Sequence, residues 1–250
     1  MDHICRLTDK CEIRRRLQTD PAWSLYALAD LDDGLFEQCD WSALGESLAL
    51  VFHGLPIRPI FVMGDATSTR ELLHSLPETT GYLTLQPDQL EGPEIYYFRE
   101  RHEMRRMLLE DFSPAKGKVE TLSRRDEADI LCLKASGGGA GIAFAPFQLD
   151  TGFFRGVRWD GELVAVAGVH AVSRNESVAA VGNVFTRPDC RGQGLARMVT
   201  SAVVTALREA GIGTIGLNVE HTNKAAIHIY EQLGFRARLT YFEGVADRIL

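Results

Sequence analysis

The chain has 250 residues, of which 45% are hydrophobic and 24% charged, and its formal net charge is -7. This is an ordinary globular composition, and the length allows one large domain or two modest ones. The acidic balance argues against nucleic acid as a partner, since phosphate binding draws on a basic surface.

The cysteines and the N-terminal residues predict the cellular location of the protein. The five cysteines are scattered and include no C-x-x-C pair, which argues against a disulfide framework and against a zinc site. The first ten residues, MDHICRLTDK, lack the apolar core of a signal peptide. No run approaches the roughly 20 apolar residues that span a bilayer. A reducing, cytoplasmic location without a membrane partner is therefore predicted.

The first part of the chain, residues 1–115, alternates helical and strand-like patterns. Residues 9–29 look helical, but Pro21 interrupts them, so two short helices are expected. A linker is predicted at Ser113–Gly117, where proline and glycine coincide with a change in composition. The other predicted elements are strands at Ser47–His53, Ile57–Met63, Gly81–Leu85 and Ile95–Phe98, a helix at Arg70–Leu76, and a segment at His102–Leu109 that fits a strand or a helix.

The second part, residues 118–250, begins with a short strand and a helix and then turns to strands. The glycine-rich stretch Ser136–Gly141 has no preceding strand and no following Lys-Ser/Thr motif, so a mobile loop is expected rather than a nucleotide loop. Asp160-Gly161 is favourable hairpin-turn chemistry. The predicted elements are a strand at Val119–Leu122, a helix at Ser123–Leu133, three antiparallel strands at Phe153–Trp159, Glu162–Val172 and Ser177–Thr186, and a last strand at Arg236–Phe242.

A glycine loop connects the third of these strands to a helix. After Pro188-Asp189 comes Arg191-Gly192-Gln193-Gly194-Leu195-Ala196, and an amphipathic pattern then runs to Ala210 and ends at Gly211. The first N–H groups of a helix have no partner within it, and glycines allow a ligand close to the backbone, so phosphate is the expected guest. The loop is not a Walker loop, and Arg197 stands where a dinucleotide fingerprint has its third glycine. A tight turn that merely uses two glycines is the alternative.

The residues that follow the glycine loop help to decide whether the loop binds a phosphate-containing ligand or is only a tight turn. A second strand at Ile212–Val219 leads to a helix that starts at Asn223, contains Tyr230 and ends at Leu233-Gly234-Phe235. This ordered set resembles the acyl-CoA site of the GNAT superfamily of acetyltransferases, whose signature Gln/Arg-x-x-Gly-x-Gly/Ala is met by Arg191, Gly194 and Ala196. The resemblance covers about the last half of the chain.

The resemblance implies a fold and a domain arrangement. The expected class is α/β (α+β): a GNAT fold with a mixed, mostly antiparallel twisted sheet flanked by helices. Residues 118–250 would form the catalytic domain. Residues 1–115 show the order strand, Gly64-Asp65 turn, helix, strand, but lack the Arg-x-x-Gly-x-Ala loop. They are interpreted as a degenerate GNAT-like copy without a cofactor site; an unrelated α/β extension is the alternative.

The resemblance also implies the activity, an acetyl-CoA-dependent N-acyltransferase that acts by direct transfer to a primary amine. Family members often dimerise, so a homodimer is consistent with it. The acceptor stays open between small molecules and peptides. The expected acetyl-CoA contacts are the backbone of Val184, Phe185 and Thr186 along the pantetheine arm, with an N–H near Val184 on the thioester carbonyl; Arg191, Gly192, Gln193, Gly194, Leu195 and Ala196 around the pyrophosphate; and Arg197, Asn223 and Ala226.

The catalytic groups are less completely specified by the sequence. Tyr230 is expected to be the general acid that protonates the departing sulfur; a buried aromatic on an amphipathic helix is the alternative. Some family members carry a glutamate on the strand before the glycine loop, but Ser177–Val184 has no carboxylate. His170 is the candidate base because its ordinary pKa is about 6.5. Glu176, Glu220, a water chain or an amine that arrives neutral are the alternatives.

Two further hypotheses compete with the enzyme. An acyl-CoA sensor that transfers nothing would explain the missing carboxylate, whereas Tyr230 favours an enzyme. A nucleotide-dependent oxidoreductase would need a doubly wound parallel sheet, which the antiparallel strands before the loop contradict. His221 and His228 form no recognisable metal pair with nearby carboxylates, so no metal is predicted.

Overall fold

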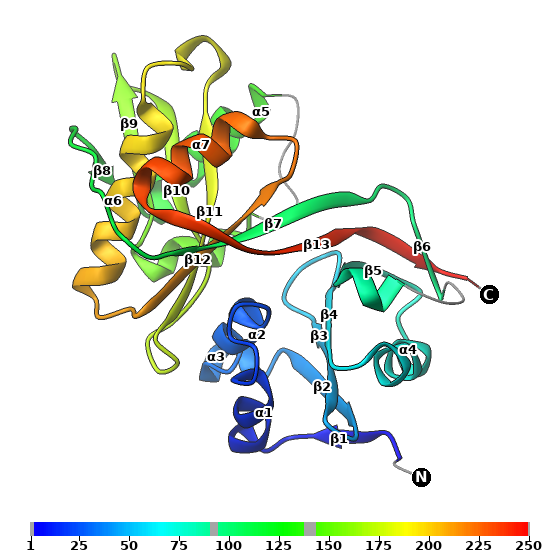
Figure 1. Ribbon diagram of the computed structural model, residues 1–250. Helices are drawn as coiled ribbons and strands as arrows, with labels where there is room; N and C mark the ends of the chain where they lie inside the picture. The colour runs from blue at the N-terminus through cyan, green and yellow to red at the C-terminus, as the bar shows by residue number, and fades with distance from the viewer. Residues whose placement is uncertain (1–2, 91–94, 138–143, 250) are drawn as a thin grey trace. The chain divides into compact units, whose positions relative to one another are not determined.

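The computed structural model describes residues 3–90, 95–137 and 144–249. The chain forms two compact units (Figure 1). Unit 1 consists of Met1–Arg106, Glu220–Thr222 and Arg238–Leu250, and unit 2 of Met107–Val219 and Asn223–Ala237. Strands β7 (His102–Leu109) and β13 (Phe235–Arg248) contribute residues to both units. The predicted division lay at residues 115–118. In the structure the first boundary falls between Arg106 and Met107, and Glu220–Thr222 and the chain after Ala237 also belong to unit 1.

Unit 1 has a mixed sheet with the order β1-β2-β3-β4-β5-β13, and β6 also pairs with β13. Neighbouring strands are antiparallel except for β4 and β5, which are parallel and joined through α4. Strands β1 and β2 were not predicted from the sequence. The elements are β1 (Cys5–Leu7), α1 (Lys10–Leu17), α2 (Leu25–Ala29), α3 (Asp33–Phe36), β2 (Cys39–Leu44), β3 (Ser47–Phe52), β4 (Pro59–Met63), α4 (Ala66–Ser75), β5 (Thr80–Leu85), η1 (Pro87–Leu90) and β6 (Tyr96–Phe98).

Helix α4 starts one turn earlier than the predicted Arg70–Leu76. Asp65 is its N-cap, and its Oδ1 accepts the backbone N–H groups of Thr67 (3.0 Å) and Ser68 (2.9 Å). A capping carboxylate satisfies N–H groups that the first turn would otherwise leave unpaired, so the helix extends back to Ala66.

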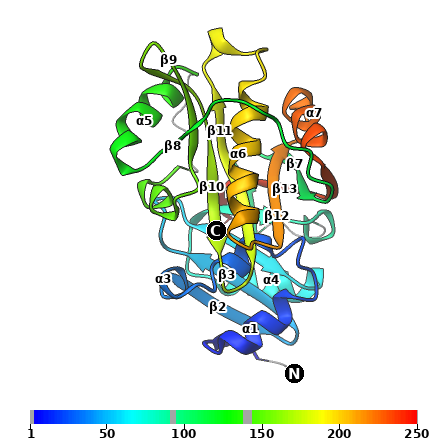
Figure 2. The same cartoon turned by 90° about the vertical axis from the view of Figure 1, so that its left-hand side faces the viewer.

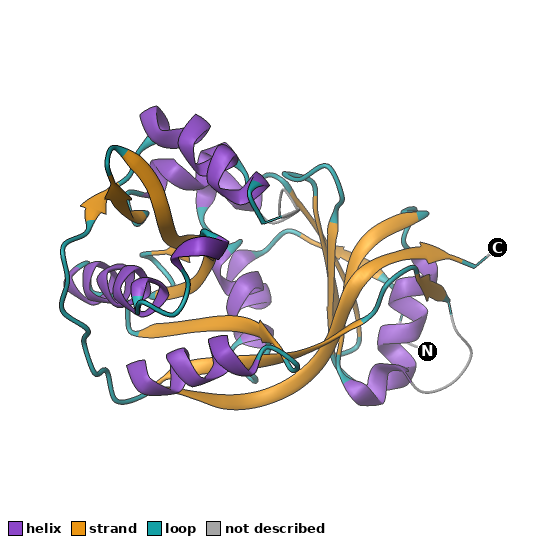
Figure 3. Ribbon diagram, turned by 90° about the horizontal axis from the view of Figure 1, so that it is seen from above, coloured by secondary structure: helices purple, strands orange, loops and turns teal. Residues whose placement is uncertain are grey.

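Unit 2 has the strand order β7-β12-β11-β10-β9-β8. The three predicted antiparallel strands are present as β9, β10 and β11, and β11 then pairs with β12 in parallel. The predicted mixed, mostly antiparallel sheet with flanking helices is confirmed (Figure 3). The elements are β8 (Glu120–Thr121), η2 (Arg124–Asp126), α5 (Glu127–Ala135), η3 (Pro146–Thr151), β9 (Arg155–Trp159), β10 (Glu162–Ser173), β11 (Val178–Thr186), η4 (Pro188–Cys190), α6 (Leu195–Glu209), β12 (Thr214–Glu220) and α7 (Lys224–Leu233).

The core of unit 2 lies between α6 and the sheet. Leu195, Val199, Val203 and Leu207 recur every four residues, so they form one apolar stripe along α6, and all are buried. The helix packs on β9, β10 and β11 (Figure 2). This packing fixes the N-terminus of α6 at the end of β11, where the glycine loop lies.

The predicted linker at Ser113–Gly117 is tied to unit 2. The backbone N–H of Ala115 donates to Ser201 Oγ on α6 at 2.8 Å. Gly117 lies so close to the Met198 side chain that a Cβ there would overlap with it. Because this segment packs on α6, the unit boundary falls instead within β7, between Arg106 and Met107.

Within the described ranges, no helix has the length and apolar character needed to cross a membrane.

Candidate active site

Strands β11 and β12 part before either of them ends. Their parallel pairing stops at Val181 and Leu217, whereas β11 continues to Thr186 and β12 to Glu220. The predicted pantetheine residues Val184, Phe185 and Thr186 lie on the part of β11 beyond this point. A backbone that has no ladder partner on one side can pair with a ligand like an added strand.

A β-bulge lies at the same place on β11. The pairs Val166–Phe185 and Gly168–Gly182 leave Asn183 and Val184 opposite a single residue of β10. Asn183 has φ 54°, a left-handed conformation that asparagine tolerates better than most residues. A bulge interrupts the ladder and redirects the groups around it, and such features are frequent beside active sites.

His170, the predicted base, holds this bulge. Its Nε2 accepts the backbone N–H of Asn183 at 3.2 Å. Burial, together with the positive charge of Lys134, lowers the pKa of His170 to about 4, so the ring is neutral at pH 7. The nitrogen that would take up a proton is already engaged, and the ring is a weak base. The geometry thus favours a positioning role for His170 over the general-base role that the sequence suggested.

The glycine loop leaves the start of α6 open. Gly194 is the N-cap with φ 77° and offers no side chain to the helix, and Gly192 has φ 78°. A Cβ at either glycine would have no atom within 4 Å, so the space in front of the helix is clear of protein. The first intrahelical bond runs from Met198 N to Gly194 O at 3.0 Å. The N–H groups of residues 195–197 are therefore free for an anion.

Side chains around this opening suit a pyrophosphate. Buried Arg197 Nε and Thr186 Oγ1 both lack a hydrogen-bond partner, as a site that awaits a polar ligand would leave them. Arg191 lies beside the loop with its guanidinium 5.9 Å from the centre of the Phe185 ring. Asp189, which precedes the loop, is paired with Arg187 at 2.8 Å, and the same guanidinium also pairs with Glu162 at 2.7 Å. The residues present thus fit the phosphates of acetyl-CoA.

Helix α7 carries the remaining predicted residues. Asn223 is its N-cap and accepts the Ala226 N–H at 3.1 Å, which confirms the capping role; contact with acetyl-CoA stays a prediction for both residues. Tyr230 is buried edge-on to Phe235, with ring centres 6.1 Å apart. Burial raises the pKa of Tyr230 to about 12, which keeps its hydroxyl protonated at neutral pH. A protonated hydroxyl is the form that a general acid requires.

Other predicted features lie away from this opening or outside the described residues. Glu176, a weaker candidate base, is in the turn before β11, at the opposite end of the strand from Val184. The predicted loop Ser136–Gly141 falls outside the described residues from 138 onward. Across residues 3–90, 95–137 and 144–249, no His, Cys, Asp and Glu side chains gather into a group that could hold a metal ion.

One polar cluster in unit 2 was not predicted from the sequence. Lys134 of α5, near the end of the helix, donates to Asn183 Oδ1 at 2.6 Å, and Asn183 Nδ2 donates to Gln148 Oε1 at 3.0 Å. These residues come from separate elements, and nothing in the local pattern of α5 distinguishes a buried lysine from an exposed one.

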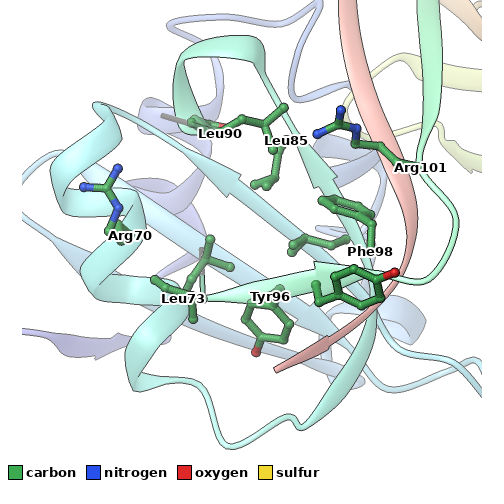
Figure 4. Close-up of a pocket in the computed structure, with 11 residues that line it drawn as sticks. Arg70, Leu73, Leu85, Leu90, Tyr96, Phe98 and Arg101 are labelled. Carbon is green, nitrogen blue, oxygen red and sulfur yellow. The ribbon is translucent and has the colours of Figure 1, made fainter. Parts of the chain in front are cut away.

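Unit 1 contains a mainly apolar cavity of about 230 Å³ (Figure 4). Arg70 of α4 and Arg101 are among its lining residues, with Leu85, Tyr96 and Phe98. None of the predicted acetyl-CoA contacts lines this cavity, and all of those contacts belong to unit 2, as do Tyr230 and His170.

Comparison with known proteins gives a family match and a fold match. The Acetyltransferase (GNAT) family model matches residues 102–235. A mycothiol acetyltransferase of Rhodococcus erythropolis (strain PR4) is 38% identical over 98 residues, which cover 39% of this chain and 30% of that protein. The chain thus matches less than a third of the length of this relative.

Two solved structures share the fold. A putative GNAT-family acetyltransferase of Novosphingobium aromaticivorans has a TM-score of 0.63 at 22% identity, over 81% of this chain and 89% of its own. A tandem GNAT protein from the clavulanic acid biosynthesis pathway has a TM-score of 0.59 at 15% identity, over 99% of this chain and 98% of its own. Both likenesses support the predicted fold, and the second is consistent with a tandem arrangement.

Proposed function

We propose that this chain, which belongs to the acetyltransferase (GNAT) family, transfers an acetyl group from acetyl-CoA directly to a primary amine of a small molecule. The chain is an acyltransferase enzyme; the donor, the acceptor and the residue roles are the proposal. The observation that carries it is the uncapped N-terminus of α6, with the unpartnered Arg197 Nε beside it, at the end of a strand that has parted from its neighbour.

The residues of unit 2 divide the work of binding the donor substrate. The free N–H groups at the start of α6, together with Arg197, hold the pyrophosphate. The backbone of Val184, Phe185 and Thr186 pairs with the pantetheine arm, which places the thioester at the bulge. An N–H near Val184 donates to the thioester oxygen, where negative charge develops as the amine attacks.

The transfer needs one bond made, one broken and two proton movements. The neutral amine attacks the thioester carbon, the carbon–sulfur bond breaks, and the sulfur leaves with the bonding electron pair. Tyr230, protonated at neutral pH, donates to that sulfur. The amine sheds its proton to solvent, because β11 carries no carboxylate near the bulge and His170 Nε2 is engaged.

A small-molecule acceptor is favoured over a peptide. The Rhodococcus erythropolis relative is named for mycothiol, a small molecule, and it shares its matched segment with this chain. This supports the class of acceptor and not its identity.

Calorimetric titration with acetyl-CoA, with NAD and ATP as controls, tests the proposal. We expect one acetyl-CoA per chain and no comparable binding of either control, followed by release of free CoA when an amine acceptor is added. Absence of acetyl-CoA binding would overturn the proposal. Two molecules per chain would instead show that unit 1 also binds the donor.

A further inference from the structure

Lys134 is a buried cation beside the bulge of β11. Its relative exposure is 7%, although lysine is rarely buried this far without an ionic partner. Its Nζ donates to Asn183 Oδ1 at 2.6 Å and lies 5.0 Å from the centre of the Phe144 ring. An ammonium has three donors, and the described contacts account for one of them.

Asn183 holds the lysine in place because its own groups are engaged. Its Nδ2 donates to Gln148 Oε1 at 3.0 Å, and its backbone N–H donates to His170 Nε2 at 3.2 Å. Gln148 is fixed in turn, since its Nε2 donates to the His170 carbonyl at 3.1 Å and its Oε1 accepts the Ala145 N–H at 3.1 Å. The network thus fixes the amide oxygen that orients the ammonium, and it extends through α5, η3, β10 and β11.

In the part of the chain that the structure describes, Lys134 forms no ion pair with a carboxylate, and the carboxylates of its own helix, Glu127 and Asp129, pair with Arg124 and Arg158. The adjacent residues 138–143, Gly-Gly-Ala-Gly-Ile-Ala, carry none in the sequence. Burial lowers the pKa of Lys134 to about 8, so the side chain is still mainly protonated at pH 7. His170 is neutral at that pH. A buried, uncompensated cation is costly, and an anionic ligand would relieve that cost.

The cation also lies next to the proposed acyl site. Asn183 immediately precedes Val184, near which the thioester carbonyl is proposed to bind, and consecutive residues of a strand are about 3.3 Å apart. Phe185 is in contact with the end of α5, since a Cβ on Gly137 would overlap its ring. Lys134 Nζ thus contacts the side chain of the residue that immediately precedes the proposed thioester site.

We propose that Lys134 binds the carboxylate of the acceptor, and that the acceptors of this enzyme are amino acids whose amine lies close to a carboxylate. This inference rests on the proposed function, because it names the substrate class of that site. In an α-amino acid the nitrogen and the carboxyl carbon are separated by two bonds, about 2.5 Å. A carboxylate held at Lys134 therefore leaves the amine near Val184, where the thioester carbonyl is proposed to bind.

A panel of L-amino acids and their α-amides, assayed by release of CoA thiol from acetyl-CoA, tests the inference. The two members of each pair share the amine and the side chain and differ in the negative charge. We expect kcat/KM to be about 10- to 100-fold higher for the acids of the preferred pairs, as for the loss of one charged hydrogen bond. Lys134→Met should remove this preference, because kcat/KM should fall further for the acids than for the amides.

Two variants control for damage to the fold and for general charge. Lys134→Gln keeps an N–H donor for Asn183 without the charge, so it should also lose the preference for acids. Lys118→Met makes the same change at an exposed lysine of unit 2 and should leave the preference intact. Equal loss of kcat on acids and amides in Lys134→Met would overturn the inference, since Lys134 would then act in the chemistry.

The two proposals can fail separately. If acids and amides are acetylated equally by the wild type, the carboxylate site is wrong while the acetyl transfer stands. If no amine of the panel is acetylated, the proposed transfer to small amines is wrong, and the site is judged by titrating acids and amides into the protein with CoA. Acid-selective heats that Lys134→Met abolishes would support the inference; equal heats for both would overturn it.

Discussion

In unit 1, β4 reaches α4 through Gly64 and Asp65, and in unit 2, β11 reaches α6 through residues 187–194. These two strand-to-helix connections, called corners below, belong to the same order of elements. A short edge strand, helices and an antiparallel meander come first, and a helix then connects to a parallel strand, β5 or β12. This correspondence supports the prediction that unit 1 is a GNAT-like copy, although the domain assignment itself stays a prediction.

The difference between the corners lies in what occupies the helix N-terminus. At α4 the Asp65 carboxylate accepts the N–H groups of Thr67 and Ser68, and Gly64 is pressed against Ser47. At α6, Gly194 offers no side chain and has clear space in front of it. The same local topology can therefore cap its own helix or leave the helix N-terminus open to an anion, and the residue at the cap is one of the differences between the two corners.

Filling the open corner should have the largest effect. Gly194→Leu puts a side chain where the pyrophosphate is proposed to lie, and the loss of several charge-assisted hydrogen bonds should weaken acetyl-CoA binding about 100-fold or more. The measurement is calorimetric titration with acetyl-CoA.

Gly211→Leu is the matched control for this change. Gly211 ends the same helix with φ 81°, and a Cβ there likewise has no atom within 4 Å, so the backbone strain is similar. Its affinity for acetyl-CoA should stay near wild type. Equal losses in both variants would mean that helix strain, and not a blocked site, causes the effect.

A comparison of one tyrosine from each unit tests whether Tyr230 is the general acid. Tyr230→Phe should lower turnover about 100-fold at unchanged acetyl-CoA affinity, because the sulfur would leave without its proton donor. Tyr82→Phe removes a hydroxyl from β5 of unit 1, where it donates to Glu243 Oε1 at 2.8 Å, and should leave turnover unchanged. Steady-state rates with a fixed acceptor decide: unchanged turnover in Tyr230→Phe would make Tyr230 a packing residue.

Much of this site could be predicted because its parts are local in sequence. The glycine loop, the Asn223 cap and the end of α7 at Gly234 each depend on residues within a turn of one another, and capping and glycine chemistry are readable at that range. The contacts of these residues with acetyl-CoA, the homodimer and the cytoplasmic location stay predictions.

The environment of the bulge could not be predicted. Lys134 and Asn183 are 49 positions apart, and Asn183 lies in the bulge that shifts the register of β11 against β10. The same shift brings the Asn183 N–H to His170 Nε2. A histidine near the end of a strand suggests a base, but its pKa depends on burial and on a lysine from another element.

The smallest expected effect concerns the closed corner. Asp65→Ala removes the cap of α4 and should lower the free energy of unfolding by about 1 kcal/mol at pH 7. Backbone and side-chain hydrogen bonds from Ser68 lead the effects that hold the pKa of Asp65 below its ordinary value. The stabilisation is therefore present above the unfolded pKa of about 3.9 and is lost as the pH falls through the folded value. Denaturant unfolding of both proteins from pH 7 downward should show the deficit shrinking in acid.

Asp65→Asn separates the cap from the charge, because asparagine caps about as well as aspartate. It should keep most of the stability at pH 7 and lose the acid dependence, whereas equal deficits in both variants would mean that the cap is not what Asp65 supplies. Acetyl-CoA should still bind once per chain to Asp65→Ala. The corner at residues 64–65 is shorter than the loop at 187–194 and has no counterpart of Arg191, so opening the cap alone builds no phosphate site. A second bound acetyl-CoA would show that the carboxylate of Asp65 was what kept unit 1 closed.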